Sequence, residues 1–201
     1  MQLTISPTSP FARKVKVALL EKGLPFEEVS LDPWASPASL LDTNPLSQVP
    51  ALAVGPGTVI ANSETILNWL EHAHPHPSLL PPPGEQAGLA RLMATAGLAN
   101  GMVEAAVQVV LERRRDAGQQ SAALLARREQ ALLRATAALE RQFHCSRDQF
   151  LLDGIGVAVA LAYLDFRLSA LGWRSRAPRL SAWQDWAAGR PSLRASAPPA
   201  A

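Results

Sequence analysis

Two serines in the first half of the chain, Ser9 and Ser63, have sequence surroundings that favour anion binding. Ser9 follows a β-favouring run at residues 3–5 and precedes Pro10, an order typical of a helix N-cap with proline at the first helical position. A hydroxyl at a helix N-terminus lies beside unpaired backbone N–H groups and the positive end of the helix dipole. That environment suits a thiolate, although most serines at such positions only cap the helix.

Two further features extend this candidate site. Val49 and Pro50 immediately precede an expected strand, so the bond between them is a candidate cis bond. If it is cis, the N–H and C=O groups of Val49 are exposed and can pair with an extended peptide. Asn62 or Ser63 is expected to cap another helix, whose N-terminus can hold a carboxylate. A thiol site and a carboxylate site joined by a strand-like clamp fit a small thiol peptide.

A small α/β layer is expected to position these residues. The predicted strands cover residues 3–5, 26–31, 51–54 and 58–61, with helices after Pro10 and after Asn62 and a weak helix at 38–42. The crossover helix implies that the first two strands are parallel, and Gly55-Pro56-Gly57 implies a hairpin between the last two. In such sheets ligands gather at strand ends, where helix N-termini converge.

Composition changes sharply in the proline-rich stretch 75–84, and the pattern beyond it is helical. Helical stripes of apolar residues run through 89–110 and 125–143, and residues 155–163 are apolar on all sides, as in a central buried helix. A short final helix is expected around residues 180–186, and the last few residues are expected to be disordered. We therefore predict domains at residues 1–78 and 87–201, joined by a linker at 79–86.

Composition excludes several classes of protein. The 201 residues are 48% hydrophobic and 18% charged, which describes a globular protein of one large or two small domains. A formal net charge of +2 is too small to imply a nucleic-acid partner. Cys145 is the single cysteine, so the chain has no disulfide framework or CxxC pair. With no signal-peptide pattern and no apolar run near the ~20 residues of a membrane span, we expect a cytoplasmic protein without a membrane partner.

Other candidate groups are weaker. His72, His74 and His76 resemble a metal-binding tract, but prolines interrupt it and we expect no metal site. Cys145 follows His144, yet adjacent side chains rarely point at each other, so an unreactive thiol is expected. An electrophile pocket could be bordered by side chains of the first long helix, namely Asn100, Met102, Glu104, Val107 and Glu112. For Met102 and Val107, however, core packing is the expected role.

The series Asn44-Pro45, Val49-Pro50 and Asn62-Ser63, following Ser9 in this order, resembles the glutathione transferase family. The likeness is greatest to bacterial members with serine at the end of the first strand, similar to the theta, beta and zeta types. Matching stretches run over residues 3–22, 44–50, 62–66 and 163–167. The resemblance implies a thioredoxin-like α/β N-terminal domain of order βαβαββα and an all-α helical-bundle C-terminal domain. It also implies a cytosolic homodimer.

The resemblance implies that Ser9 is the catalytic residue. In that family the residue at this position hydrogen-bonds the glutathione sulfur and favours the thiolate. A free thiol has a pKa of about 8.5, so lowering it by one or two makes the thiol mostly ionised at neutral pH. Thr8 is a competing hydroxyl, and Ser6 opens a Ser-x-x-Ser spacing that also occurs in isomerase-type members.

The resemblance also implies a glutathione-binding groove. Its residues are Ser9, Phe11, Gln48, Val49, Pro50, Asn62 and Ser63. The backbone of Val49 would pair with the cysteinyl part of glutathione, and Pro50 would be the cis-proline of the family. Ser63 would bind the γ-glutamyl carboxylate. Asn62 departs from the acidic residue or glutamine that is usual before this serine, so it cannot form an ion pair with the γ-glutamyl ammonium.

The function implied is conjugation of the glutathione thiolate with a small hydrophobic electrophile, with glutathione as co-substrate and without a metal. An enzymatic alternative is a glutathione-dependent isomerase or dehalogenase that uses the same site. A non-catalytic alternative is a binding or regulatory protein of the same fold, and the departure at Asn62 favours it. Equal activity of the wild type and Ser9→Ala against a panel of electrophiles would indicate the non-catalytic protein.

Overall fold

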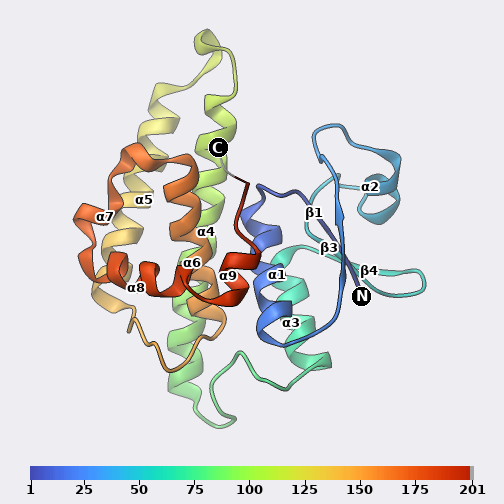
Figure 1. Ribbon diagram of the computed structural model, residues 1–201. Helices are drawn as coiled ribbons and strands as arrows, with labels where there is room; N and C mark the ends of the chain where they lie inside the picture. The colour runs from blue at the N-terminus through green and yellow to red at the C-terminus, as the bar shows by residue number, and fades with distance from the viewer. Residues whose placement is uncertain (200–201) are drawn as a thin grey trace. The chain divides into compact units, whose positions relative to one another are not determined.

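The computed structural model describes residues 1–199, and their contacts divide the chain into two compact units (Figure 1). The first unit combines residues 1–81 with residues 190–199, and the second comprises residues 82–189. The sequence predicted domains at 1–78 and 87–201. In the structure, residues 190–199 instead belong to the first unit. The last two residues of the expected disordered end lie outside the described part of the chain.

The first unit is built on a four-stranded sheet with the order β2-β1-β3-β4. The strands are β1 (Gln2–Ile5), β2 (Glu27–Ser30), β3 (Ala51–Gly55) and β4 (Thr58–Ala61). β1 pairs in parallel with β2 and antiparallel with β3, and β3 forms a hairpin with β4. Gly57 has the positive φ of 69° that this tight turn requires. The predicted strands and their pairing are confirmed.

Three helices follow the strands in the predicted order, namely α1 (Pro10–Glu21), α2 (Ala38–Thr43) and α3 (Ser63–Ala73). α1 and α3 pack against each other on one side of the sheet, and α2 lies on the other side (Figure 1). The core between these helices and the sheet contains Leu3, Ile5, Val15, Leu19, Leu52, Ile66 and Leu70, all at most 5% exposed. The βαβαββα order confirms the thioredoxin-like fold class.

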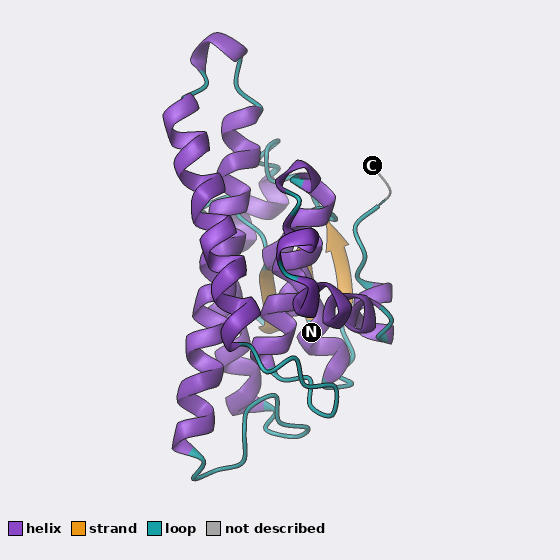
Figure 2. Ribbon diagram, turned by 90° about the vertical axis from the view of Figure 1, so that its left-hand side faces the viewer, coloured by secondary structure: helices purple, strands orange, loops and turns teal. Residues whose placement is uncertain are grey.

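All regular structure in residues 82–189 is helical (Figure 2). The long helices are α4 (Gln86–Arg113), α5 (Ala122–Gln142) and α6 (Leu152–Arg167), followed by the shorter α7 (Trp173–Arg176) and α8 (Pro178–Ala188). α6 is buried on all sides from Gly154 to Leu161, as its uniformly apolar sequence predicts. Gly156 lets α4 approach closely, since a Cβ at this position would lie 3.3 Å from the Ala99 Cβ. The helical C-terminal fold class is confirmed.

α4 is long and apolar enough to cross a membrane by length and composition alone, a criterion that core helices of soluble proteins also meet. Within its unit it packs against α5 and α6. One third of its most apolar window is buried. Part of its apolar surface therefore remains exposed in a single copy of the chain.

The helix expected near residue 183 is α8, but it is not the last helix. α9 (Pro191–Ala195) follows it and packs against α1 (Figure 1). Arg190 donates to both carboxylate oxygens of Glu21, at 3.0 and 2.7 Å, and the Ser192 hydroxyl donates to the same carboxylate. α9 was not predicted from the sequence, because its anchor, Glu21, lies about 170 residues away in the chain.

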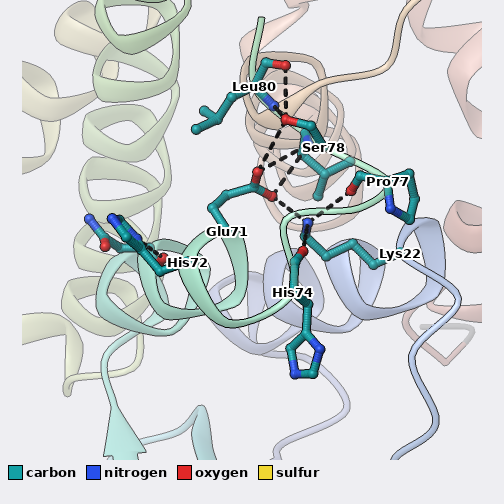
Figure 3. Close-up of polar contacts among 9 residues, drawn as sticks. Lys22, Glu71, His72, His74, Pro77, Ser78 and Leu80 are labelled. Carbon is teal, nitrogen blue, oxygen red and sulfur yellow. Dashed lines mark hydrogen bonds and ion pairs between the residues drawn. The ribbon is translucent and has the colours of Figure 1, made fainter. Parts of the chain in front are cut away.

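A buried ion pair joins the C-terminal ends of α1 and α3. Lys22 Nζ lies 2.8 Å from Glu71 Oε1, and their side chains are 0% and 6% exposed. Lys22 also donates to the carbonyl oxygens of His74 and Pro77, at 2.7 and 2.9 Å. Glu71 accepts from the backbone N–H of Leu79, at 3.2 Å. Figure 3 shows how these contacts bind the proline-rich segment after α3 to both helices.

Candidate functional site

Ser9 is the N-cap of α1, as the sequence predicts. Its Oγ accepts from the N–H of Ala12 at 3.2 Å, and its carbonyl accepts from the N–H of Arg13 at 3.0 Å. Pro10 has no N–H, so in this first turn Phe11 carries the backbone N–H that has no partner among residues 1–199. The cap uses the Ser9 oxygen as acceptor and leaves its proton available to donate. An anion here would meet a hydroxyl, an N–H group and the positive end of α1.

The other candidate residues near Ser9 do not cap α1. Thr8 is half-buried in the turn before α1 and does not occupy the N-cap. The carbonyl of Ser6 accepts from the N–H of Ser9 at 2.9 Å, which closes this turn. Phe11 is half-buried at the second position of α1. Which hydroxyl contacts a ligand, and whether Phe11 does, remain predictions.

The Val49–Pro50 peptide bond is cis, as proposed from the sequence. Within residues 1–199, no hydrogen bond engages the backbone of Val49. Gln48 is exposed, and its carbonyl accepts from Asn44 Nδ2 at 2.8 Å. Asn44 is 4% exposed, and its Oδ1 also accepts from the N–H of Leu46 at 3.1 Å. Asn44 therefore positions this loop, a role that the sequence analysis missed although an asparagine in a loop is a known signal for such turns.

Asn62, rather than Ser63, is the N-cap of α3. Its Oδ1 accepts from the N–H groups of Glu64 and Thr65, at 2.9 and 3.3 Å. Its backbone has a positive φ of 72°, which asparagine adopts more often than most residues other than glycine. Ser63 is the first residue of α3, is 4% exposed, and has no hydrogen-bond partner within the described chain for its hydroxyl. A carboxylate could therefore bind at this helix N-terminus.

An ion pair between Lys14 and Glu64 joins the two helices whose N-termini carry Ser9 and Ser63. The Lys14 side chain is 5% exposed and that of Glu64 is 52% exposed. Because α1 and α3 meet here, the pair fixes the position of one helix N-terminus relative to the other. This ion pair was not predicted from the sequence, because its partners are 50 residues apart.

The sheet register brings the three candidate loops to one end of the sheet. Thr4 of β1 pairs with Ala51 of β3, and Ala51 pairs with Ala61 of β4. At this end the chain leaves β1 toward α1, enters β3 from the cis-proline loop and leaves β4 toward α3. The structure therefore places the candidate thiol site, peptide clamp and carboxylate site beside one another.

The other candidates from the sequence are not part of this arrangement. His72 Nδ1 lies 2.9 Å from the Asn68 carbonyl, and the His74 ring packs edge-on against Trp69. Within residues 1–199 no group of three or more His, Cys, Asp or Glu side chains is suited to hold a metal ion. Burial raises the pKa of the Cys145 thiol, which makes it a poorer nucleophile at neutral pH.

Several polar residues of α4 have structural partners. Asn100 donates to Glu104 at 2.8 Å, one helical turn away. Glu112 accepts from the N–H of Ser121 at 2.6 Å, and this hydrogen bond lowers the pKa of Glu112. Met102 is 2% exposed and belongs to the core. The electrophile pocket expected along this helix thus remains a prediction.

A family model and a protein of known sequence are both similar to this chain. A family model described as "Glutathione S-transferase, N-terminal domain" matches residues 3–78. The uncharacterized GST-like protein YibF of Escherichia coli is 34% identical over 184 residues, which cover 90% of each chain.

Solved structures are similar over nearly the whole chain. A glutathione S-transferase from Methylobacterium radiotolerans, in complex with glutathione sulfonate, has a TM-score of 0.91 and 36% identity over 100% of this chain and 95% of its own. A glutathione transferase family member from Pseudomonas fluorescens with bound glutathione has a TM-score of 0.89 and 35% identity over 99% of both chains.

Proposed function

The chain belongs to the glutathione S-transferase family, and we propose that it binds glutathione at the three gathered loops and transfers its thiolate to small hydrophobic electrophiles. The observation that carries this proposal is the sheet register that sets the N-termini of α1 and α3 beside the free backbone of Val49. The glutathione ligands named for two similar solved structures support it.

In the proposed mechanism, the Ser9 hydroxyl donates a hydrogen bond to the glutathione sulfur. Lowering the pKa of a thiol by one or two requires about 1.4–2.7 kcal/mol of preferential stabilisation of the thiolate. One hydrogen bond to a charged group together with a helix dipole can supply that amount. The thiolate then forms a C–S bond with an electrophilic carbon, whose displaced electron pair leaves with a leaving group or enters a conjugated acceptor.

The remaining groups would hold the peptide. Val49 offers a backbone N–H and C=O, and Ser63 offers an N–H and a hydroxyl to the γ-glutamyl carboxylate. Phe11, Gln48 and Pro50 would line the same groove. Asn62 uses its carbonyl oxygen for capping, so the group it has left is an amide donor, which cannot pair with the γ-glutamyl ammonium.

Binding to immobilised glutathione tests this proposal. We expect the purified wild type to be retained and to elute with free glutathione. Ser63→Ala should weaken glutathione binding about tenfold or more, because one hydrogen bond to a charged carboxylate is lost. Thr65→Ala, on the same helix and exposed, is the matched control and should bind as the wild type does. A wild type that is not retained contradicts the proposed function.

Asn62 favours one alternative, a glutathione-binding protein without catalytic activity. Weak anchoring of the γ-glutamyl end would hold the thiol less firmly against an electrophile. Retention on glutathione without conjugation of any electrophile in a broad panel would indicate this alternative. Because glutamine is one of the residues usual at this position, Asn62→Gln should then bind glutathione more tightly than the wild type.

We further propose that the protein acts in the cytoplasm, where a thiol co-substrate and a free cysteine both stay reduced. We also propose that it forms a homodimer through α4. Leu89 and Met93 are 39% and 51% exposed, and a Cβ at Gly97 or Gly101 would meet open space. Spaced by four residues, these positions form one stripe along the helix, which a second copy could cover with the same stripe.

Light scattering tests the homodimer. We expect the wild type to have twice the mass of one chain and Met93→Arg to shift the population toward monomer, because a charge would be buried in the interface. Leu124→Arg changes an equally apolar, 36% exposed residue on α5 and should leave the mass unchanged. A monomeric wild type contradicts the assembly.

A further inference from the structure

Arg13 differs from the other cationic side chains of α1 and its C-cap. Lys14, Lys16 and Lys22 each form an ion pair with a glutamate, at Glu64, Glu28 and Glu71 respectively. The Arg13 guanidinium instead donates to two uncharged acceptors, the Ser196 hydroxyl at 3.3 Å and the Leu193 carbonyl at 3.1 Å. Within residues 1–199 no carboxylate pairs with it.

The charge of Arg13 is also largely removed from water. Burial lowers the pKa of its guanidinium to about 10, so the group is still cationic at neutral pH. A buried cation without a counter-ion is costly to the folded protein, and a bound anion would offset that cost. Such a group is expected where a ligand supplies the missing negative charge.

Arg13 lies one helical turn after Ser9. Residues four apart share one face of a helix, and helical side chains lean toward the N-terminus. The guanidinium is therefore carried on the face and toward the end of α1 where the Ser9 hydroxyl and the Phe11 N–H remain available. Its charge adds to the positive end of the helix dipole.

We propose that Arg13 is a positioning residue whose uncompensated charge, held in place by the C-terminal segment 193–196, favours the thiolate of glutathione bound beside Ser9. This inference rests on the proposed function. It assigns a role to the end of the chain, since the Leu193 carbonyl and the Ser196 hydroxyl orient the guanidinium without neutralising it.

The charges on the elements packed against α1 do not cancel that of Arg13. On α3, Glu64 and Glu71 bind Lys14 and Lys22, and His72 is exposed. Beside α9, Arg190 binds Glu21 and Arg194 is exposed. β1 carries no charged residue.

Titration of bound glutathione tests the proposal through the ultraviolet absorbance of the thiolate. Arg13→Met should reduce the thiolate fraction at neutral pH by about three- to tenfold, an effect expected for loss of one partly screened charge within roughly 10 Å. Arg13→Lys should restore part of it. Arg190→Met is the matched control, because it also removes an arginine that contacts α1, beside Glu21 and two turns farther from Ser9, but leaves the contacts of Arg13 with Leu193 and Ser196 in place. The thiol of glutathione bound to Arg190→Met should have the same pKa as that bound to the wild type.

The outcomes separate a charge effect from a structural one. If Arg13→Met titrates as the wild type, or if Arg190→Met shifts the titration equally, Arg13 is only a structural anchor for α9 and the inference is wrong. If Arg13→Met does not fold, Arg13→Gln removes the charge but keeps an N–H donor for the Leu193 carbonyl. A wild type that binds no glutathione overturns the proposed function, whereas retention with an unchanged titration in the variants overturns this inference alone.

Discussion

Ser9→Ala is expected to lower kcat/KM for conjugation about 10- to 100-fold at neutral pH while leaving most of the glutathione affinity. The hydroxyl would donate to a charged sulfur, and such hydrogen bonds contribute about 1.5–3 kcal/mol. Retained affinity is expected because the Val49 backbone and Ser63 hold the rest of the peptide. Steady-state kinetics at saturating glutathione and varied electrophile concentration would measure kcat/KM for the electrophile.

The pH dependence of conjugation should show that Ser9→Ala acts through the pKa of the bound thiol. A hydrogen bond to the thiolate lowers the pKa of the bound thiol, so its removal raises that pKa toward about 8.5. The activity of Ser9→Ala should therefore rise with pH until about 9, where the wild type has already reached its plateau. A variant profile parallel to that of the wild type would contradict the proposed role of Ser9.

Ser9 also caps α1, and a control must remove that contribution. Ser121 is the N-cap of α5 and accepts from the N–H of Leu124 at 3.2 Å, the same distance as from Ser9 to Ala12. Ser121→Ala should cost about 1 kcal/mol of stability, as Ser9→Ala does through its cap, without changing conjugation. Thr8→Val tests the competing hydroxyl and should retain activity if Ser9 activates the thiol.

Lys22→Met is expected to destabilise the protein by about 3–5 kcal/mol. Removing one member of a buried ion pair leaves the other charge uncompensated. Here the Glu71 carboxylate would remain 6% exposed, and the carbonyl groups of His74 and Pro77 would lose their donor. Denaturant unfolding at neutral pH, followed by circular dichroism, would measure the loss.

A second ion pair on the same helix provides the control. Lys16 Nζ lies 2.6 Å from Glu28 Oε2, but these side chains are 20% and 33% exposed. Lys16→Met should therefore cost less than about 1 kcal/mol. The double variant Lys22→Met/Glu71→Gln should lose less than the sum of its single variants, because the second change removes a charge that the first had isolated. Equal costs for Lys22→Met and Lys16→Met would contradict this account.

Local signals in the sequence determined much of the fold. Ser9 followed by Pro10 predicted the start of α1, because capping involves residues within one turn. The turn at Gly55-Pro56-Gly57 predicted the β3–β4 hairpin for the same reason. The apolar pattern of α6 predicted a buried helix, since a helix without a polar face needs neighbours on all sides.

The capping of α3 shows where local signals stop. The sequence left Asn62 and Ser63 as alternatives, because both residue types cap helices well. The structure gives Asn62 a positive φ at the end of β4, and its side-chain carbonyl oxygen accepts from two N–H groups of α3. That geometry depends on the backbone conformation of Asn62 itself, which the residue types alone do not specify.

The order of residue types along the chain, from Ser9 through Val49-Pro50 to Ser63, determined that this protein has the parts of a thiol-peptide site. Only the tertiary structure decided that these parts meet, through the register of Thr4, Ala51 and Ala61. It also decided that the C-terminal segment returns to α1 and holds Arg13. The physical reason is the separation along the chain between the residues that interact. Caps and turns involve neighbours in sequence, whereas the ion pair of Lys14 with Glu64 and the contact of Arg13 with the Leu193 carbonyl join residues 50 and 180 positions apart.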